Sequence, residues 1–148
     1  KNSHVVPALI SRIHLAKINN DPEVVIWGSG KVKRDFLYID DMASAAIFVI
    51  QLDEIKYQLN TEPMLSHINI GTGKDITIKQ LAETIKKIVG YDGVLKYDLS
   101  KPDGTERKLV DTSKLLKMGW NYNIELEEGL RTTYEWYTKS KDSLVIRR

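Results

Sequence analysis

Basic side chains gather in three separate stretches of the sequence, in a pattern that could bind an anion. A diphosphate is held best by several converging cations, with arginine offering a bidentate fork and lysine a point charge. A nearby aromatic ring, such as that of Trp27, could form a wall for a sugar or a base. A solvated surface is the simpler interpretation, so the residues alone leave both open. The basic residues in question are Arg12, Lys31, Lys33, Arg34, Arg107 and Lys108.

His4 is the residue whose type and position favour proton transfer. An imidazole exchanges protons near neutral pH, and His4 lies just before an expected helix. A structural or simply exposed histidine is the commoner case, and the residues alone do not decide between these roles. The three histidines lie far apart and the chain has no cysteine, so no metal site is predicted.

Two other patterns resemble motifs of nucleotide-dependent enzymes, but one lacks the required spacing and the other lacks the required context. Gly71-Thr72-Gly73-Lys74 lacks the spacing of a P-loop or of a dinucleotide fingerprint, so we interpret it as a structural turn. Tyr-x-x-x-Lys, the catalytic pair of short-chain dehydrogenases, occurs at Tyr97/Lys101 and at Tyr137/Lys141. Neither follows a strand that ends in an active-site serine, which favours chance occurrence.

The composition is that of an ordinary globular chain. Its 148 residues include 22 basic and 20 acidic side chains, with a formal net charge of +2. This balance argues against general binding to nucleic acids or membrane surfaces, so a basic site would have to be local. No apolar run reaches the roughly 18 residues that span a bilayer. The chain starts at Lys1 without a methionine, and its length fits one domain or part of a larger one.

Apolar spacing and turn residues predict a mixed α/β fold. A capping box at Thr77 and Gln80 should start one helix, and Gly90 should end it. Asp40 and Asp41 should cap another helix that is apolar on nearly every face and must therefore be buried. Residues 53–65 should form a polar loop. Helices are expected at 7–17, 42–52, 78–89, 112–118 and 126–139, and strands at 24–27, 36–39, 67–70 and 94–97.

Several stretches taken together resemble one known family. They read NSHVVPALISR, VVIWGSGKVKRDFLYIDDMASA, PMLSHINIGTGKDITIKQLAETI and KPDGTERKLVD. From Asn2 to about Tyr137, the chain resembles the C-terminal half of the GDP-L-fucose synthases, within the extended short-chain dehydrogenase/reductase family. MLSHINIGTG and KPDGT-RK are specific to this branch. FLYIDDMA is shared more widely among nucleotide-sugar epimerases and dehydratases.

This resemblance implies an NADPH-dependent GDP-4-keto-6-deoxymannose 3,5-epimerase/4-reductase that makes GDP-L-fucose. Residues 1–148 would be its C-terminal substrate-binding portion, with one helix and one strand, in about 40–73, packing into the cofactor domain. That N-terminal domain, outside these residues, would bind most of the NADP(H), so this chain alone should be inactive. The full enzyme would be cytoplasmic and homodimeric. Alternatives are another nucleotide-sugar epimerase or dehydratase, or a non-catalytic sugar-phosphate-binding module.

The resemblance also implies roles for individual residues. His4 matches a proton donor in the epimerisation and would also contact the cofactor. Lys33 matches no assigned position, and Val94 stands where relatives can carry a substrate-contacting arginine. The residues that would bind or line the GDP-sugar site are Arg12, Trp27, Arg34, Asp103 and Lys108.

Overall fold

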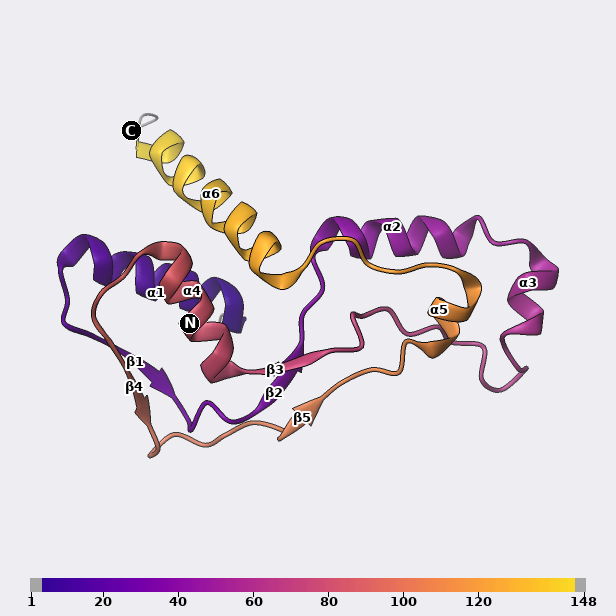
Figure 1. Ribbon diagram of the computed structural model, residues 1–148, viewed down its shortest axis with the longest axis horizontal. Coiled ribbons are helices and arrows are strands. Elements are labelled where there is room, and N and C mark those ends of the chain that lie inside the picture. The colour runs from indigo at the N-terminus through magenta and orange to yellow at the C-terminus, as the bar shows by residue number, and fades with distance from the viewer. Residues whose placement is uncertain (1–3, 146–148) are drawn as a thin grey trace. The chain divides into compact units, whose positions relative to one another are not determined.

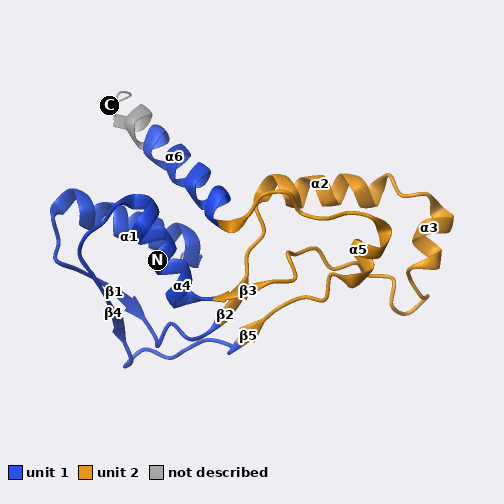
Figure 2. Ribbon diagram, in the orientation of Figure 1, with its two compact units in different colours: residues 1–32, 77–106, 127–148 blue, residues 33–76, 107–126 orange. Residues whose placement is uncertain are grey.

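The mixed α/β fold predicted from the sequence is confirmed. A computed structural model describes residues 4–145, with side chains as far as residue 140. Its helices and strands fall into two compact units, coloured separately in Figure 2. Unit 1 comprises residues 1–32, 77–106 and 127–148, and unit 2 comprises residues 33–76 and 107–126.

Unit 1 is built on a parallel pair of strands, β1 and β4. The two strands are paired in register from Glu23 and Val94 to Trp27 and Asp98, and they lie side by side in Figure 1. Side chains alternate between buried and exposed along β1, because successive residues of a strand face opposite sides. The elements of this unit are α1 (Val5–Asn19), β1 (Glu23–Trp27), α4 (Ile78–Val89), β4 (Val94–Asp98) and α6 (Leu126–Val145).

The core of unit 1 comes from apolar stripes at helical spacing. Helix α1 packs against α4, and each buries one face while the other stays in solvent. The ammonium of Lys17 donates a 2.7 Å hydrogen bond to the carbonyl oxygen of Val89, which joins the ends of these helices. The fully or nearly fully buried residues are Leu9, Ile10, Ile13, Ala16, Leu81, Ala82, Ile85 and Val89.

Helix boundaries in unit 1 follow the predicted signals closely. The capping box of Thr77 and Gln80 is present at the start of α4, and Gly90 ends this helix in the left-handed conformation. Helix α1 begins at Val5, so Pro7 is at its third position and not its first, as the sequence suggested. Proline is tolerated there because the first four amides of a helix have no intrahelical acceptor. Helix α6 runs to Val145, six residues beyond its expected end at 139.

Unit 2 has a small sheet and a separate apolar cluster. The strand order is β3-β2-β5, and β2 pairs in parallel with β5. Ala45, Leu115 and Trp120 form the buried cluster, and the indole nitrogen of Trp120 donates to the hydroxyl of Ser44 at 3.1 Å. The elements are β2 (Lys33–Asp35), α2 (Ile39–Ile50), α3 (Glu54–Leu59), β3 (Asp75–Thr77), β5 (Arg107–Lys108) and α5 (Ser113–Met118).

Two predicted strands in unit 2 are wrong. Residues 36–38 are irregular and Ile39 already belongs to α2, because the strand before them ends at Asp35. Residues 67–70 also form no strand. Their alternation reflects packing instead, since Ile68 and Ile70 contact the apolar cluster. Alternation alone cannot supply the partner strand that a ladder needs.

The predictions around α2 also need correction. The helix starts at Ile39, and its N-cap is Tyr38, which makes no side-chain capping bond. Asp40 and Asp41 lie in the first turn, where carboxylates interact favourably with the helix dipole. Residues 53–65 are not simply a loop, because Asp53 accepts hydrogen bonds from the amides of residues 55 and 56 and starts the short helix α3.

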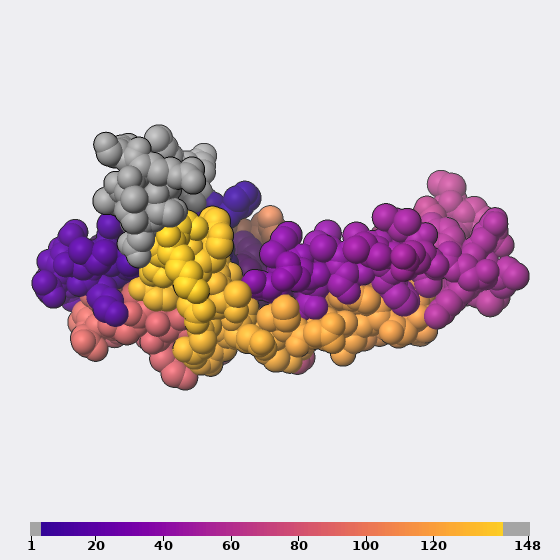
Figure 3. All heavy atoms as spheres, turned by 90° about the horizontal axis from the view of Figure 1, so that it is seen from above, coloured from indigo at the N-terminus to yellow at the C-terminus, as the bar shows by residue number. Residues whose placement is uncertain are grey.

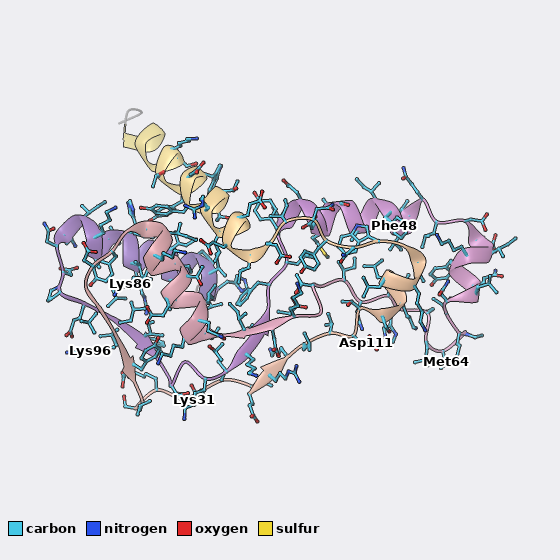
Figure 4. The ribbon with its side chains drawn as sticks, viewed as in Figure 1. Lys31, Phe48, Met64, Lys86, Lys96 and Asp111 are labelled. Carbon is cyan, nitrogen blue, oxygen red and sulfur yellow. The ribbon has the colours of Figure 1, made fainter. Side chains whose placement is uncertain are left out.

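The apolar surface of α2 is largely exposed in these residues. Ile50 has 83% of its surface accessible to solvent, and Ala45 is the helix's fully buried apolar residue. Helices α2 and α3 lie along one side of unit 2 in Figure 3, and Met64 is labelled on the following segment in Figure 4. The expected burial on most sides is therefore wrong for this chain. Further exposed apolar residues of this region are Ile39, Met42, Ile47, Ile55, Leu59 and Leu65.

Asp41 is a buried carboxylate that ties α2 to a later segment of unit 2. It is 3% exposed, and its two oxygens accept hydrogen bonds from the amides of Asn123 and Ile124 at 3.1 and 2.9 Å. Both hydrogen bonds are partly buried, and an amide that is shielded from water is costly without an acceptor. The carboxylate therefore fixes the path of the chain between α5 and α6.

We predict that Asp41→Ala lowers the free energy of unfolding by about 2 kcal/mol, because two amides lose their acceptor. Urea unfolding followed by circular dichroism measures this change. Asp40→Ala is the matched control, since its carboxylate is exposed and is on the same helical turn. Equal unfolding midpoints for the two variants would contradict the role given to Asp41.

Candidate functional site

An exposed tryptophan marks the carboxyl end of the parallel strand pair in unit 1. Trp27 is the last residue of β1, is 63% exposed and is in register with Asp98, the last residue of β4. In α/β folds, ligands bind outside the carboxyl ends of parallel strands, where the following loops meet. A large exposed aromatic ring at this edge offers a flat apolar surface to a ligand ring.

Two cations accompany the ring of Trp27. The guanidinium of Arg12 lies 5.6 Å from the ring centroid, and it also donates to the carbonyl oxygen of Val25 at 3.3 Å. The ammonium of Lys101 lies 5.8 Å from the same centroid. Both distances fall within the range of cation–π attraction. Positive charge is thus concentrated beside an apolar surface.

The turn after Trp27 and the loop after β4 are joined through one carbonyl oxygen. The carbonyl oxygen of Asp98 accepts from the amide of Gly28 at 3.0 Å and from the amide of Lys101 at 3.2 Å. The Asp98 side chain accepts in turn from the amide and hydroxyl of Ser100. Both bonds lower the pKa of Asp98, and the bond from the hydroxyl has the larger effect.

Asp103 closes the turn that follows Trp27. One carboxylate oxygen accepts from the amide of Ser29 at 2.8 Å, and the other from its hydroxyl at 2.7 Å. Both bonds lower the pKa of Asp103, and the bond from the hydroxyl has the larger effect. Gly28 has a φ of +80°, and a side chain there would meet this carboxylate. Both the positive φ and the close approach of Asp103 therefore require glycine at position 28.

Two of the predicted basic residues lie together in unit 2. Arg34 on β2 is in register with Lys108 on β5, and both line a cavity of about 490 Å³. Leu37 and Val110 line the same cavity, which makes it partly apolar. This unit therefore also combines positive charge with an apolar hollow.

The glycine turn after residue 70 is not a phosphate loop. The carboxylate of Asp35 accepts hydrogen bonds from the amides of Thr72 and Gly73, and from the Thr72 hydroxyl. Amides engaged by a carboxylate cannot cradle a phosphate, which confirms the interpretation as a structural turn. The backbone donors of this turn serve the fold of unit 2.

His4 lies at the N-terminus of α1 and is exposed. Its carbonyl oxygen accepts from the amide of Ala8 at 3.0 Å, and its side chain makes no capping bond. Its neighbours Asn2 and Ser3 lie outside the described residues. Among residues 4–145, no cluster of three or more His, Asp or Glu could hold a metal ion. No helix in that range is long and apolar enough to cross a membrane.

The Tyr-x-x-x-Lys patterns do not assemble a catalytic pair at Tyr97. Its ring packs beside Gly30 and Lys79, whereas Lys101 lies over Trp27. The chance interpretation therefore holds for Tyr97/Lys101, whereas the side chain of Lys141 lies outside the described side chains. Sequence reasoning also overlooked Lys101 as a neighbour of Trp27. The pairing register of β1 and β4 would have revealed this, and it cannot be read from residue spacing.

Comparisons with known proteins agree with this fold. The chain is 54% identical over 141 residues to a GDP-L-fucose synthase of Escherichia coli (strain K12), and a model of the NAD dependent epimerase/dehydratase family matches residues 1–71. The chain is thus similar to GDP-L-fucose synthases over most of its length and, over residues 1–71, to the NAD dependent epimerase/dehydratase family. The alignment with that relative covers 95% of this chain and 44% of the relative.

Other relatives match to a similar extent. The chain is 47% identical over 140 residues to GDP-L-fucose synthase 1 of Arabidopsis thaliana, covering 95% of this chain and 41% of that protein. Among solved structures, a GDP-mannoheptose C4 reductase from Campylobacter jejuni with NADP bound has a TM-score of 0.79 and 40% identity. That comparison covers 93% of this chain and 46% of the reductase. The chain therefore spans less than half the length of these relatives.

We predict that Ser29→Ala raises the pKa of Asp103 toward the ordinary value of about 3.9, because the hydroxyl bond is lost. Carbon-13 NMR titration of the carboxyl group measures the change. Because the pKa of Asp103 is lower in the folded state than in the unfolded state, its ionised form stabilises the fold at pH values above the unfolded-state pKa. This stabilisation is lost as the pH falls through the folded-state pKa. The variant should therefore lose less stability on acidification below about pH 4.

The control for this titration is Ser100→Ala. It removes the corresponding hydroxyl from Asp98, so it should raise the pKa of Asp98 and leave Asp103 unchanged. An unaltered Asp103 titration in the Ser29→Ala chain would show that the hydroxyl bond is not the cause.

Proposed function

We propose that this chain is the GDP-sugar-binding part of an NADPH-dependent enzyme that makes GDP-L-fucose from GDP-4-keto-6-deoxymannose. Similarity to proteins named GDP-L-fucose synthase supports the reaction. The observation that carries the proposal is the exposed ring of Trp27 with two cations beside it, at the carboxyl end of parallel strands. This arrangement offers an apolar surface to a base or sugar and positive charge to a diphosphate.

In unit 1, we assign substrate contacts to Arg12, Trp27 and Asp103. The guanidinium of Arg12 can make a bidentate contact with phosphate oxygens. Asp103 already accepts two hydrogen bonds from Ser29, but a carboxylate has about four lone-pair sites. Its remaining acceptor sites suit a ribose or hexose hydroxyl.

In unit 2, we assign substrate contacts to Arg34 and Lys108. Their adjacent positions on β2 and β5 and their shared cavity support a common role with an anionic ligand. Lys33 and Arg107 receive no such role. Arg107 forms an ion pair with Asp75, and Lys33 precedes Arg34 on the exposed side of its strand.

His4 is assigned the part of an acid in the epimerisation. Removing a proton next to a ketone gives an enediolate, and an acid must return a proton on the opposite face. An imidazole is suited to this near neutral pH, and exposure of His4 leaves its ring accessible to a substrate. A second acid/base residue has to act on the opposite face, since one group on one face cannot invert a centre.

The glycine turn at residues 71–73 does not fit the diphosphate of NADP(H), because the amides of Thr72 and Gly73 bond to Asp35. We therefore place the cofactor mainly in a portion of the enzyme outside these 148 residues, with contact to His4 at most. The cofactor would deliver hydride to C4. By themselves, these residues should bind substrate without turning it over.

The exposed apolar residues of α2 and α3 fit the same proposal. We infer that the region around residues 40–73 packs against the cofactor-binding portion of the longer enzyme. An apolar surface of this extent usually marks an interface. The exposure of Ile39, Ile47 and Ile50 supports this inference, because burial of such side chains is favourable.

Ile50→Lys should lower the melting temperature of the longer enzyme by several degrees, since about 1 kcal/mol shifts it by roughly 2–4 °C in chains of 150–250 residues. The same change should leave the isolated chain unaffected, because Ile50 is exposed there. Ile18→Lys, at an exposed position of α1, is the control and should alter neither protein. A highly cooperative melt of the isolated chain, combined with no effect of Ile50→Lys in the longer enzyme, would refute the inference.

The direct test of the nucleotide assignment is binding selectivity. Titration calorimetry of the chain with GDP, UDP and dTDP should give markedly tighter binding of GDP. Trp27→Leu should weaken GDP binding at least about tenfold, because the ring surface is lost. Trp136→Leu is the control, since Trp136 is exposed on α6 in the same unit.

The alternatives predict different outcomes in this titration. An enzyme for another nucleotide sugar would prefer UDP or dTDP, or would bind GDP but select a different hexose. A non-catalytic module would bind sugar phosphates equally well with His4→Ala. In the longer enzyme, His4→Ala would then leave the rate of epimerisation unchanged, which would remove the acid role.

A further inference from the structure

Lys101 is the second of the two cations near Trp27, and it is not among the residues assigned an individual substrate contact above. Its side chain is exposed, and its ammonium lies 5.8 Å from the ring centroid of Trp27. Among the side chains that the structure describes, none forms a salt bridge with Lys101. By contrast, Lys96 on the preceding strand β4, labelled in Figure 4, forms an ion pair with Glu23. Lys101 is therefore held near an aromatic surface. The Asp98 carboxylate is close enough to interact with its charge, but that carboxylate already accepts two hydrogen bonds from Ser100.

The position of Lys101 is fixed by its backbone. Its amide donates to the Asp98 carbonyl oxygen, which also accepts from the amide of Gly28, directly after Trp27. Two residues further on, Asp103 holds the amide and hydroxyl of Ser29. The loop is thus joined to the turn after Trp27 on both sides of Lys101. The long side chain starts from a defined place beside the ring, although its tip can move.

We propose that Lys101 is a further substrate-binding residue, whose ammonium binds a phosphate oxygen of a nucleoside diphosphate that lies on Trp27. This assignment rests on the proposed function, since it needs a nucleotide at the Trp27 surface. Arg12 approaches the same ring, so a diphosphate there would meet two cations from separate elements, α1 and the loop after β4. Attraction to an exposed ring is weak, and a phosphate would compete for the ammonium effectively.

The test compares Lys101→Gln with Lys96→Gln, which removes the same charge elsewhere on β4 and its loop. Calorimetric titration uses GDP and guanosine as ligands, and circular dichroism checks that each variant is folded. Lys101→Gln should weaken GDP binding about tenfold, and guanosine binding should stay unchanged because guanosine has no phosphate. Lys101→Arg should restore most of the GDP affinity, since it retains the charge.

The outcomes separate this assignment from the proposed function. Equal GDP affinities for Lys101→Gln and Lys96→Gln, together with a loss in Trp27→Leu, would overturn the Lys101 assignment and leave the nucleotide site in place. An equal loss of guanosine and GDP binding in Lys101→Gln would also overturn it, because the contact would then not be with phosphate. No detectable GDP binding by the unchanged chain at millimolar concentration would overturn both proposals.

Discussion

The parallel pairing of β1 with β4 is the constraint on which the candidate site depends. It brings Trp27 and Asp98 to the same end of the sheet, although 70 residues separate them along the chain. The carbonyl oxygen of Asp98 then accepts hydrogen bonds from the amides of Gly28, after β1, and Lys101, after β4. Without this register, the aromatic ring and the cation from the later loop would not share one surface. Positions near Trp27 are thus determined by backbone hydrogen bonds more than by side-chain contacts.

Several carboxylates in this chain accept hydrogen bonds from backbone amides. Asp41 and Asp35 do so in unit 2, and Asp98 and Asp103 do so in unit 1. A carboxylate that accepts amide and hydroxyl bonds keeps its charge but has its oxygens directed into the fold. Arg12 and Lys101 near Trp27 are exposed, and the Asp98 carboxylate near Lys101 is engaged by Ser100. Positive charge therefore lies beside the Trp27 ring, where an anionic ligand can reach it.

Sequence reasoning succeeded where local signals and tertiary packing agree. In unit 1, the capping box at Thr77 and the end of α4 at Gly90 were predictable because both depend on residues close in sequence. In unit 2, residues 36–39 and 67–70 were wrongly predicted as strands, since a ladder needs a distant partner that periodicity cannot reveal. For the site, Trp27 and Arg12 were candidates from their residue types and gained specific roles from the family resemblance, but their proximity was not visible in their spacing. Lys101 was missed for the same reason.

The central claim is that the exposed face at the end of β1 binds a nucleotide diphosphate. The measurement that tests it most directly is a crystal structure of the chain with GDP. The account predicts a base or sugar ring lying on Trp27, with phosphate oxygens within hydrogen-bonding distance of Arg12. Ordered GDP bound elsewhere, with the Trp27 ring still exposed to solvent, would contradict it.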